Sequence, residues 1–376
     1  MSPRPSFFEI ISPADPALIQ PPTFTVKAEM RKFILFLLLL ALGIAGWIAY
    51  TLYAPYRGFE APGVFVDIPK GASERSIARL LASQGAVRNE WTFLLLCRYH
   101  SRRRPEAGEY YFTSPESAFQ VFDTLAAGKV YEISVTIPEG FNSFQIGSLL
   151  EEKGFTTRDE FVEATHNTSN IRDIAPGAPT VEGFLFPATY QFPRHVTPQQ
   201  IISAMTDHFR QEWSALAAAN PVTDGRTTLQ IVTLASLVES ETPKVEERPI
   251  IAGVFMNRLR RNMPLGCDPT VVYALEKVGH YSGILTVADL RVDSPYNTYR
   301  FAGLPPGPIA NPGDTSLRAA LQPAAVAYLY FVADTEGGHL FGKTLEEHNR
   351  NVARYHRLLA QKSIRSPSVP QEQKRP

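Results

Sequence analysis

The sequence predicts an α+β fold: a single N-terminal transmembrane helix, a small strand–helix subdomain, and a larger mixed α+β domain. An uncharged apolar run near the N-terminus predicts the membrane helix. A strand–helix pattern that occurs twice predicts the small subdomain and the start of the larger one. From about residue 155 to residue 360, longer helices alternate with loops rich in proline and glycine, which is typical of a mixed domain. The 376 residues fit two or three domains of roughly 150 residues each.

Composition excludes several classes of protein. Lys and Arg together number 37 and Asp and Glu also number 37, so the chain lacks the basic excess of a nucleic-acid binder. A hydrophobic content of 44% is enough for real cores and excludes wholesale disorder. With only two cysteines, Cys97 and Cys267, neither a disulfide-rich scaffold nor a cysteine-based zinc cluster is expected. The eight histidines are scattered without an HExxH pattern, so we expect no metal and no cofactor.

The apolar run extends from Phe33 to Tyr53 without a charge. At about 1.5 Å per residue it spans a hydrocarbon core of about 30 Å. Trp47, Tyr50 and Tyr53 gather at its C-terminal end, where amphipathic rings favour the membrane interface. The run begins too far from the N-terminus and is too long for a signal peptide, and a buried helix of this length would show a polar face. The sequence therefore predicts a single-pass membrane anchor.

Charges flanking this run predict its orientation. Lys27, Arg31 and Lys32 precede it, whereas Arg57 is the first basic residue after it. Because basic residues favour the cytoplasmic side, the N-terminus is expected in the cytoplasm and the chain after about residue 54 outside the inner (plasma) membrane. Residues 1–30, rich in proline and without periodicity, are predicted to be a flexible cytoplasmic tail.

An internal repeat predicts two copies of one strand–helix unit. The first copy, Ile68–Gly85, reads IPKGASERSIARLLASQG, and the second, Ile137–Gly154, reads IPEGFNSFQIGSLLEEKG. Each copy predicts a strand that ends at Ile-Pro, an N-cap at Ser73 or Asn142, and a short helix closed by glycine. Such units are common in binding modules.

Further elements of the small subdomain are predicted between the two copies. Trp91–Tyr99 is an apolar helical stretch, Gly108–Phe112 reads as a strand, and Ala118–Leu125 reads as a helix. The run Arg98–Arg104 (RYHSRRR) is a local basic cluster in a neutral chain. It is compatible with binding to anionic lipid headgroups, with binding to an acidic polymer, or with a solvated loop.

The larger domain is predicted to be mainly helical. Leu229–Val238 and Ile250–Leu259 are apolar helices, and Phe301–Gly313 is too rich in proline to be regular and is expected to be an ordered loop. Tyr328–Ala333 is predicted to be a buried strand. Residues 361–376 are polar and are predicted to be disordered.

One glutamate stands out as a candidate for proton transfer. The apolar helix around TLASLVE leads directly to Glu239, and Pro243 ends it at about residue 242. Desolvation at such a position raises the pKa of a carboxyl group, so that it can donate a proton near neutral pH, as cleavage of a glycosidic bond requires. Glu241 lies roughly 200° away around the helix and cannot face the same cleft. The alternative is that Glu239 is a solvated cap or a salt-bridge partner.

A resemblance to a known family selects this glutamate. Sequence motifs typical of that family follow one another between about residues 64 and 355: EGFLFPATY (182–190), LASLVESE (234–241), VFMNRL (254–259), DPTVVYAL (268–275), SPYNTY (294–299), GLPPGPIANPG (303–313), YLYFVA (328–333) and EHN (347–349). In these motifs the chain resembles the MltG/YceG-like family of membrane-anchored endolytic transglycosylases of the bacterial cell wall.

The resemblance implies a LysM-like subdomain at residues 64–132 and a YceG-like catalytic domain at 133–360. It implies an endolytic peptidoglycan lytic transglycosylase that cleaves the β-1,4 bond between N-acetylmuramic acid and N-acetylglucosamine in nascent glycan strands. The products would carry 1,6-anhydromuramyl ends, and strand elongation would be limited. Glu239 would be the catalytic residue, and peptidoglycan synthases would be partners.

Polar positions of the family motifs imply further substrate contacts, although each of these residues is equally compatible with a turn or a buried hydrogen bond. They are Glu182, Tyr190, Asn257, Asp268, Thr270, Tyr296, Asn297 and Tyr299. The chain departs from the family pattern at Ala188, Gly266 and Cys267, which places the details of substrate binding in doubt. In an oxidising periplasm Cys97 and Cys267 are free to pair, but no disulfide is predicted.

Three other functions compete with this interpretation. A non-catalytic peptidoglycan-binding scaffold would use Glu239 only structurally. A pyridoxal-phosphate lyase would need a Schiff-base lysine, and the motifs contain only Lys244. A muramidase with two carboxylates would produce reducing ends in place of anhydro ends.

Overall fold

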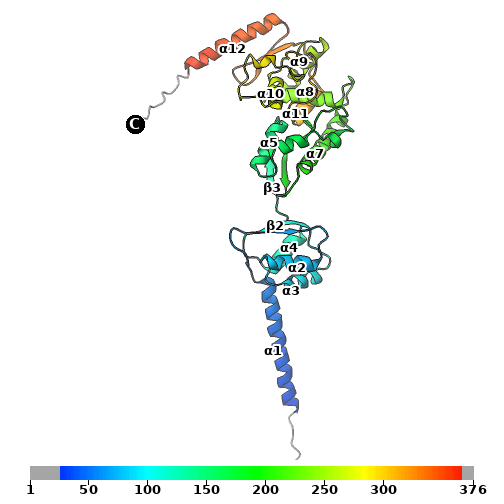
Figure 1. Ribbon diagram of the computed structural model, residues 1–376, viewed down its shortest axis with the longest axis vertical. Coiled ribbons are helices and arrows are strands. Elements are labelled where there is room, and N and C mark those ends of the chain that lie inside the picture. Colours follow the sequence, from blue (N-terminus) through cyan, green and yellow to red (C-terminus); the bar gives the residue numbers. More distant parts are fainter. Residues whose placement is uncertain (1–25, 366–376) are drawn as a thin grey trace, which may run out of the picture. The chain divides into compact units, whose positions relative to one another are not determined.

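The computed structural model describes residues 26–365, which form two compact units that divide between Tyr131 and Glu132 (Figure 1). Helices dominate both units, and the strands form three two-stranded antiparallel sheets within the described residues. The predicted α+β class with an N-terminal apolar helix is confirmed.

The N-terminal helix α1 (Val26–Tyr53) is long and apolar enough to cross a membrane. Within its stretch Glu29–Tyr53, an 18-residue window has a mean hydropathy of 2.5, and the apolar side chains there are exposed. The helix starts at Val26, so residues 26–30 are helical and do not belong to a flexible tail as predicted. Good helix formers in this stretch and the ion pair between Lys32 and Glu29 favour the additional turn. The rest of the predicted tail, residues 1–25, lies outside the described residues.

The first compact unit, here unit 1, includes α1. After α1 it places helices against one small sheet. Its elements are β1 (Val64–Ile68), α2 (Glu74–Ser83), α3 (Glu90–Tyr99), β2 (Gly108–Phe112) and α4 (Ala118–Ala126). Strand β1 pairs with β2 in a register that puts Val64 opposite Phe112. Tyr110, Phe93 and Phe122 are fully buried at the centre of the core. These elements match the predicted ones, whereas the LysM-like character of the unit stays a prediction.

The second unit, here unit 2, begins with the second copy of the repeat. Its first elements are β3 (Ile133–Thr136), α5 (Ser143–Glu152), α6 (Arg158–Ala164), the short helix η1 (Thr168–Ile171), β4 (Thr189–Phe192) and α7 (Pro198–Ala219). Strand β3 pairs with β4. As predicted, Ser73 caps α2 and Asn142 caps α5. Each helix is followed by a glycine with positive φ, which closes the helix as the sequence indicated.

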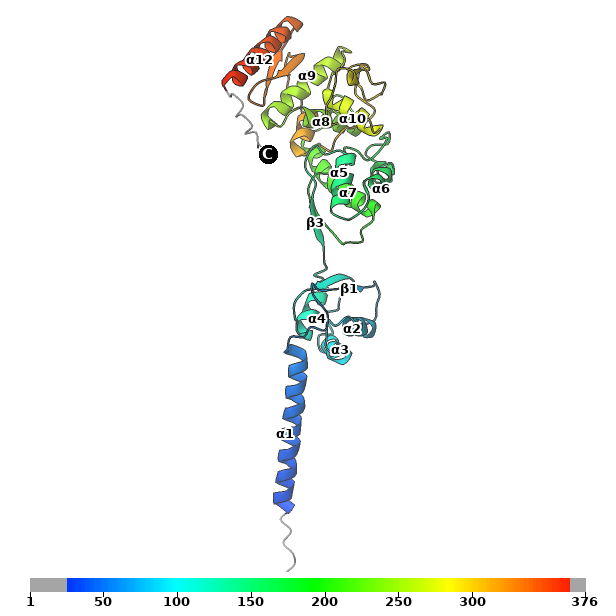
Figure 2. The same ribbon diagram turned by 60° about the vertical axis from the view of Figure 1, so that its left-hand side comes forward.

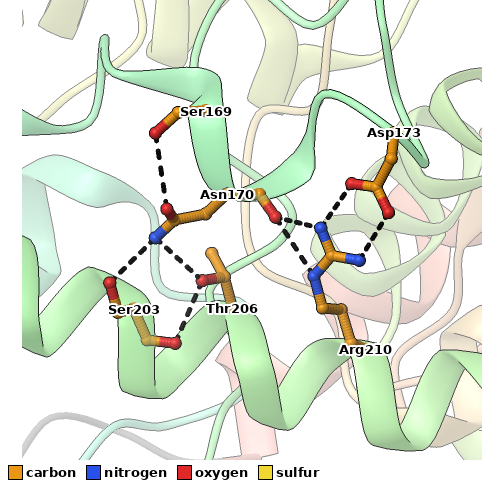
Figure 3. A network of polar contacts seen from close by, with 6 residues as sticks. All are labelled: Ser169, Asn170, Asp173, Ser203, Thr206 and Arg210. Carbon is orange, nitrogen blue, oxygen red and sulfur yellow. Dashed lines mark hydrogen bonds and ion pairs between the residues drawn. The ribbon is translucent and has the colours of Figure 1, made fainter.

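A network of polar contacts connects η1 to α7 (Figure 3). Asn170 donates to Ser203 at 2.9 Å and to Thr206 at 3.4 Å. Arg210 on α7 pairs with Asp173 just after η1. These contacts hold a segment with little regular structure against a long helix, which fixes one wall of unit 2.

The centre of unit 2 is helix α8 (Thr228–Glu241), whose residues 231–238 are all buried. The following elements are η2 (Val245–Glu247), α9 (Arg248–Arg260), α10 (Asp268–Lys277), η3 (Asp289–Arg291) and α11 (Asp314–Leu321). Helices α9, α10 and α11 all pack against α8 (Figure 2). A helix surrounded in this way holds the side chains of its last turn in fixed positions.

The C-terminal part differs from the prediction in two places. It comprises β5 (Tyr330–Ala333), β6 (His339–Gly342) and α12 (Leu345–Arg365). Strand β5 starts two residues later than predicted, and it is only half-buried because it pairs with β6 alone in a hairpin. Residues 361–365 were predicted to be disordered but continue α12, while residues 366–376 lie outside the described part.

Candidate active site

A cleft of about 620 Å³ opens in unit 2 where four segments meet. The turn between β3 and α5, the end of α8, one face of α10 and the loop before α11 form its walls. Its lining includes Glu139, Gly140, Phe141, Asn142, Gln145, Glu239, Ser240, Asp268, Tyr273, Glu276, Tyr281, Ile309 and Ala310. Acidic, amide and aromatic side chains therefore surround the space.

Glu239 reaches the cleft from the last turn of α8, with a side chain that is 5% exposed. The backbone N–H of Gly313 donates to its Oε2 at 3.0 Å, and Nη2 of Arg248 donates to its Oε1 at 2.7 Å. The helix ends at Glu241, where Thr242 turns extended ahead of Pro243. The carboxyl group is thus held by one N–H donor and one cation at the point where the helix stops.

The surroundings of Glu239 act on its pKa in opposite directions. Burial raises the pKa, and the negative charge of Glu139 adds to this increase. The Gly313 N–H and the charge of Arg248 lower it by stabilising the carboxylate. Burial dominates, so the pKa of Glu239 lies above its usual value. This is the condition that a proton donor near neutral pH requires.

Arg248, the first residue of α9, lies between two carboxylates of the cleft. It is 2.7 Å from Glu239 and 3.6 Å from Glu139, and it also donates to Thr315. The Arg248 side chain is 6% exposed, whereas that of Glu139 is half exposed. Sequence reasoning missed both residues. A signal was present for Glu139, because it occupies the position that Lys70 occupies in the first copy of the repeat.

Glu139 packs directly on Gly313, so a side chain at position 313 would have to displace the Glu139 carboxyl group. A Cβ atom on residue 313 would lie 2.1 Å from the carboxyl carbon of Glu139. The φ angle of Gly313 is −79°, which any residue can adopt, so the constraint is space and not backbone conformation. On the other side of Glu139, the N–H of Gly140 donates to the carbonyl of Asn311 at 2.9 Å. The turn and the loop before α11 are therefore in direct contact at the acid.

Glu182 lies behind the cleft and does not line it. It is 1% exposed and accepts hydrogen bonds from Ser143 N at 2.9 Å, Ser143 Oγ at 2.7 Å and Asn311 Nδ2 at 2.7 Å. Tyr273, which does line the cleft, donates to it at 3.2 Å. Burial raises the pKa of Glu182, and these donors oppose the increase. The structure shows an internal role for this residue, and its contact with substrate stays a prediction.

Three other predicted contact residues hold loops by internal hydrogen bonds and are absent from the cleft lining. Asn257 donates to the carbonyls of Val326 and Tyr328, both at 2.8 Å. Thr270 donates to the carbonyl of Cys267 at 2.6 Å, and Asn297 donates to the carbonyl of Val292 at 2.8 Å. Thr270 and Asn297 are fully buried, and each fixes the path of a connection.

Two predicted tyrosines also lie outside the cleft lining. Tyr190 on β4 donates to the carbonyl of Phe186 at 2.6 Å. Tyr296 is buried against Tyr273, with ring centroids 5.0 Å apart. Tyr296 thus supports Tyr273 in the cleft wall, and a contact of either tyrosine with substrate stays a prediction.

Of the predicted contact residues, Asp268 lines the cleft and Tyr299 reaches it only through a hydrogen bond to Asp268. Asp268 lines it at the start of α10, and Tyr299 Oη donates to Asp268 at 2.5 Å. Tyr299 is partly exposed. A role for this pair in substrate binding stays a prediction.

The structure explains one of the three departures from the family pattern, Gly266, and places the other two. Gly266 has a φ of +57°, a conformation that favours glycine. Cys267 is fully buried beside Glu241, and Ala188 accepts a backbone hydrogen bond from Ile137 at 2.9 Å. Glu241 points to Cys267 and away from the cleft, as the helical spacing predicted.

Both cysteines are free and buried. Within residues 26–365, no group of three or more His, Cys, Asp or Glu side chains is placed to hold a metal ion.

Comparisons with known proteins identify relatives along most of the chain. The model of the YceG-like family matches residues 66–354. An endolytic murein transglycosylase of Bacillus subtilis is 32% identical over 324 residues, which cover 81% of this chain and 88% of the relative. An endolytic murein transglycosylase of Streptococcus pneumoniae is 31% identical over 88% of this chain, which spans only 65% of that relative's length.

A solved structure agrees with this match. The crystal structure of a YceG-like protein from Listeria monocytogenes has a TM-score of 0.51 at 31% identity, covering 77% of this chain and 99% of that one. The family model includes the segments that build the cleft. The chain belongs to the YceG-like family.

Proposed function

We propose that this protein is an endolytic peptidoglycan lytic transglycosylase in which Glu239 is the catalytic acid and base. The relatives from Bacillus and Streptococcus bear the name endolytic murein transglycosylase. The observation that carries the proposal is the buried carboxyl group of Glu239, which has a raised pKa and reaches an open cleft. The family match covers the segment that contains this residue.

The proposed reaction has two proton transfers on one carboxyl group. Protonated Glu239 gives its proton to the glycosidic oxygen between N-acetylmuramic acid and N-acetylglucosamine as the bond from C1 of the muramyl residue breaks. The C6 hydroxyl of the same muramyl residue then attacks C1, and its proton goes to the Glu239 carboxylate. The product is a 1,6-anhydromuramyl end, and no water is consumed. An internal nucleophile supplies the proximity that a bound water would otherwise have to provide.

Arg248 and Gly313 are placed to stabilise the Glu239 carboxylate that remains after the first proton transfer. Once Glu239 has lost its proton, the donors at 2.7 Å and 3.0 Å stabilise the carboxylate. Before that transfer, burial is the main cause that raises the pKa of Glu239, and the negative charge of Glu139, 3.6 Å from Arg248, adds to the increase. We propose Arg248 and Glu139 as positioning residues that balance the two protonation states.

The cleft has the chemistry that binding of an amino-sugar chain requires. Phe141, Tyr273 and Tyr281 provide ring surfaces for sugar faces, and Asn142 and Gln145 provide amide groups. Asp268 with Tyr299 adds a polar pair at the start of α10. We propose that these residues bind the strand on either side of the bond that is cleaved.

We further propose that α1 anchors the protein in the inner membrane with its N-terminus in the cytoplasm. The helix is of sufficient length, and the basic residues Lys27, Arg31 and Lys32 precede its apolar part. The cleft would then act outside the cytoplasm on nascent strands, in cooperation with peptidoglycan synthases. A protease that reaches an N-terminal tag from outside intact cells would contradict this orientation, and failure to co-purify with a synthase would leave the partnership unsupported.

Product analysis tests the reaction. The full chain and Glu239→Gln, both in the same detergent, are incubated with uncrosslinked peptidoglycan strands and the fragments are weighed by mass spectrometry. Internal fragments with anhydromuramyl ends, one water lighter than hydrolysis products, are expected only from the wild type. Reducing ends would overturn the transglycosylase in favour of a hydrolase with a second carboxylate, for which Glu139 is placed. Binding without cleavage by both proteins would favour a scaffold.

A further inference from the structure

The exposed face of helix α3 is apolar where a soluble protein would present polar side chains. Trp91, Leu95 and Tyr99 recur every four residues and form one stripe along the helix. All three are exposed, and Tyr99 is 82% exposed. The opposite face, with Phe93 and Leu96, is buried in the core of unit 1. Helix α3 is therefore apolar on both sides.

Unpaired positive charges border this stripe. Arg98 lies on the same face of α3, and Arg102 and Arg104 follow directly after the helix, all three exposed. None of the three makes a side-chain hydrogen bond or ion pair with a residue that the structure describes. Their neighbour Arg103 differs, because it pairs with Asp123 at 2.7 Å. We call Trp91, Leu95, Arg98, Tyr99, Arg102 and Arg104 the basic–aromatic surface.

Helix α1 fixes where this surface lies. The ring of Trp91 stacks on the ring of Trp47 in α1, with centroids 5.1 Å apart. Tyr53 contacts Phe119 of α4 at 5.7 Å, which adds a second contact between α1 and the rest of unit 1. In both views α3 lies at the end of unit 1 from which α1 emerges, and the strands lie at the other end (Figures 1 and 2).

The membrane that α1 spans must then reach α3. Charges up to Lys32 prevent the hydrocarbon core from beginning before Phe33, and about 20 residues from there extend to about Leu52. Trp47 accordingly lies inside or at the edge of the hydrocarbon core. A ring stacked on Trp47 lies at the depth of the headgroups or below, and that ring is Trp91.

From these observations we propose that the basic–aromatic surface docks unit 1 on the bilayer, next to its own anchor. Trp91, Leu95 and Tyr99 enter the boundary between headgroups and acyl chains, as in interfacial amphipathic helices. Arg98, Arg102 and Arg104 bind the phosphates of anionic lipids. The inference rests on the proposed membrane anchor, and it adds that unit 1 lies against the membrane and does not extend freely from it.

The docking is tested with the full chain reconstituted in bilayer nanodiscs. An environment-sensitive dye is attached to Tyr99→Cys or, as the control, to Lys70→Cys in the exposed turn between β1 and α2. The native thiols of Cys97 and Cys267 are buried, and the wild type reports any background labelling. Two lipid mixtures are used, phosphatidylcholine alone and phosphatidylcholine with phosphatidylglycerol.

We expect quenching by aqueous iodide to be several-fold weaker at position 99 than at position 70. Quenching by spin-labelled lipids should be correspondingly stronger, and both differences should grow with phosphatidylglycerol. Reversing the charges in Arg98→Glu/Arg102→Glu/Arg104→Glu should remove the dependence on phosphatidylglycerol. The control variant Lys70→Glu/Lys129→Glu reverses two exposed lysines outside the surface. In this variant only the dye at position 99 is measured, and the dependence of its quenching on phosphatidylglycerol should be unchanged.

Each contrary outcome identifies what failed. If the chain does not incorporate into nanodiscs, the proposal that α1 is a membrane anchor is itself wrong. Incorporation with equal quenching at positions 99 and 70 would overturn the docking and leave the anchor standing. A probe at position 99 that responds to added polyphosphate but not to phosphatidylglycerol would overturn the lipid assignment in favour of an anionic polymer.

Discussion

Arg248 and Glu239 form an ion pair of 2.7 Å in which both side chains are almost fully buried. Alone, such a pair keeps a carboxyl group ionised, whereas a proton donor must first carry its proton. Burial of Glu239 and the negative charge of Glu139 act against the arginine, and the pKa of Glu239 is raised. The pair is therefore best suited to the carboxylate that forms once the proton has left.

Replacement of Glu239 by Gln should greatly reduce the rate of turnover, while the protein still folds. A loss of roughly 10²–10⁴ in rate is the usual contribution of general acid–base catalysis. Gln has one acceptor oxygen, so it keeps only one of the two hydrogen bonds that the Glu239 oxygens accept from Gly313 and Arg248, and the melting temperature should fall moderately while the protein still folds. Release of anhydromuramyl products is the measurement, and a variant that melts like the wild type and retains its full rate would exclude Glu239.

Replacement of Glu139 by Gln should move the pH profile of kcat/KM. The charge of Glu139 raises the pKa of Glu239, so its removal lowers that pKa. Because activity requires protonated Glu239, the alkaline limb should shift to lower pH. Glu276→Gln is the matched control, since Glu276 also lines the cleft but does not act on Glu239 in this way. A limb that stays in place in Glu139→Gln would refute the proposed balance.

Replacement of Gly313 by Ala should resemble a weaker form of the Glu139 substitution. The new methyl group occupies the position of the Glu139 carboxyl group and displaces this flexible side chain, while the backbone N–H to Glu239 remains. The alkaline limb should shift in the same direction, by less. In the double variant Gly313→Ala/Glu139→Gln, the limb should not move beyond that of Glu139→Gln alone, because both changes act through one charge. Additive shifts would show that Gly313 acts by another route.

Replacement of Glu182 by Ala should reduce stability. It leaves the buried donors of Ser143, Asn311 and Tyr273 without their acceptor. An unsatisfied buried donor costs about 1–3 kcal/mol, so a loss of about 3 kcal/mol or more is expected. In a unit of this size that lowers Tm by about 6–12 °C. Glu151→Ala, on the exposed side of α5, should leave Tm unchanged, and an equally stable Glu182→Ala with an increased KM would restore the substrate-binding interpretation.

Local patterns predicted most of the secondary structure. Apolar periodicity located α3, α8 and α9, and the two copies of the repeat predicted the caps Ser73 and Asn142 together with their closing glycines. These features depend on residues close in sequence, so the chain reveals them directly. The burial of β5 was mispredicted, because an apolar run does not indicate how many strands will pair with it.

The site was predictable only in part for the same reason. Glu239 could be selected because an apolar helix leads to it. Glu139 and Arg248 lie on other segments, and only the folded chain brings all three together. Glu182, Thr270 and Asn297 were predicted from family motifs to contact substrate, and the structure shows that each also makes internal hydrogen bonds. A polar residue in a motif does not distinguish contact with a ligand from an internal hydrogen bond.

The loop before α11 has a consequence for inhibitor design. Asn311 binds Glu182 and the backbone of Gly183, Leu185 and Phe141, while Gly313 binds Glu239. Because the loop before α11 is attached at so many points, it has little freedom to adapt to a compound that mimics the unreacted sugar. A rigid, cationic compound could instead mimic the muramyl ring at the moment when the bond from C1 breaks and the ring flattens. It would meet the two acidic groups Glu139 and Glu239 in their existing positions. Chemical selectivity for this site should therefore come from shape and charge at the reacting centre more than from length along the strand.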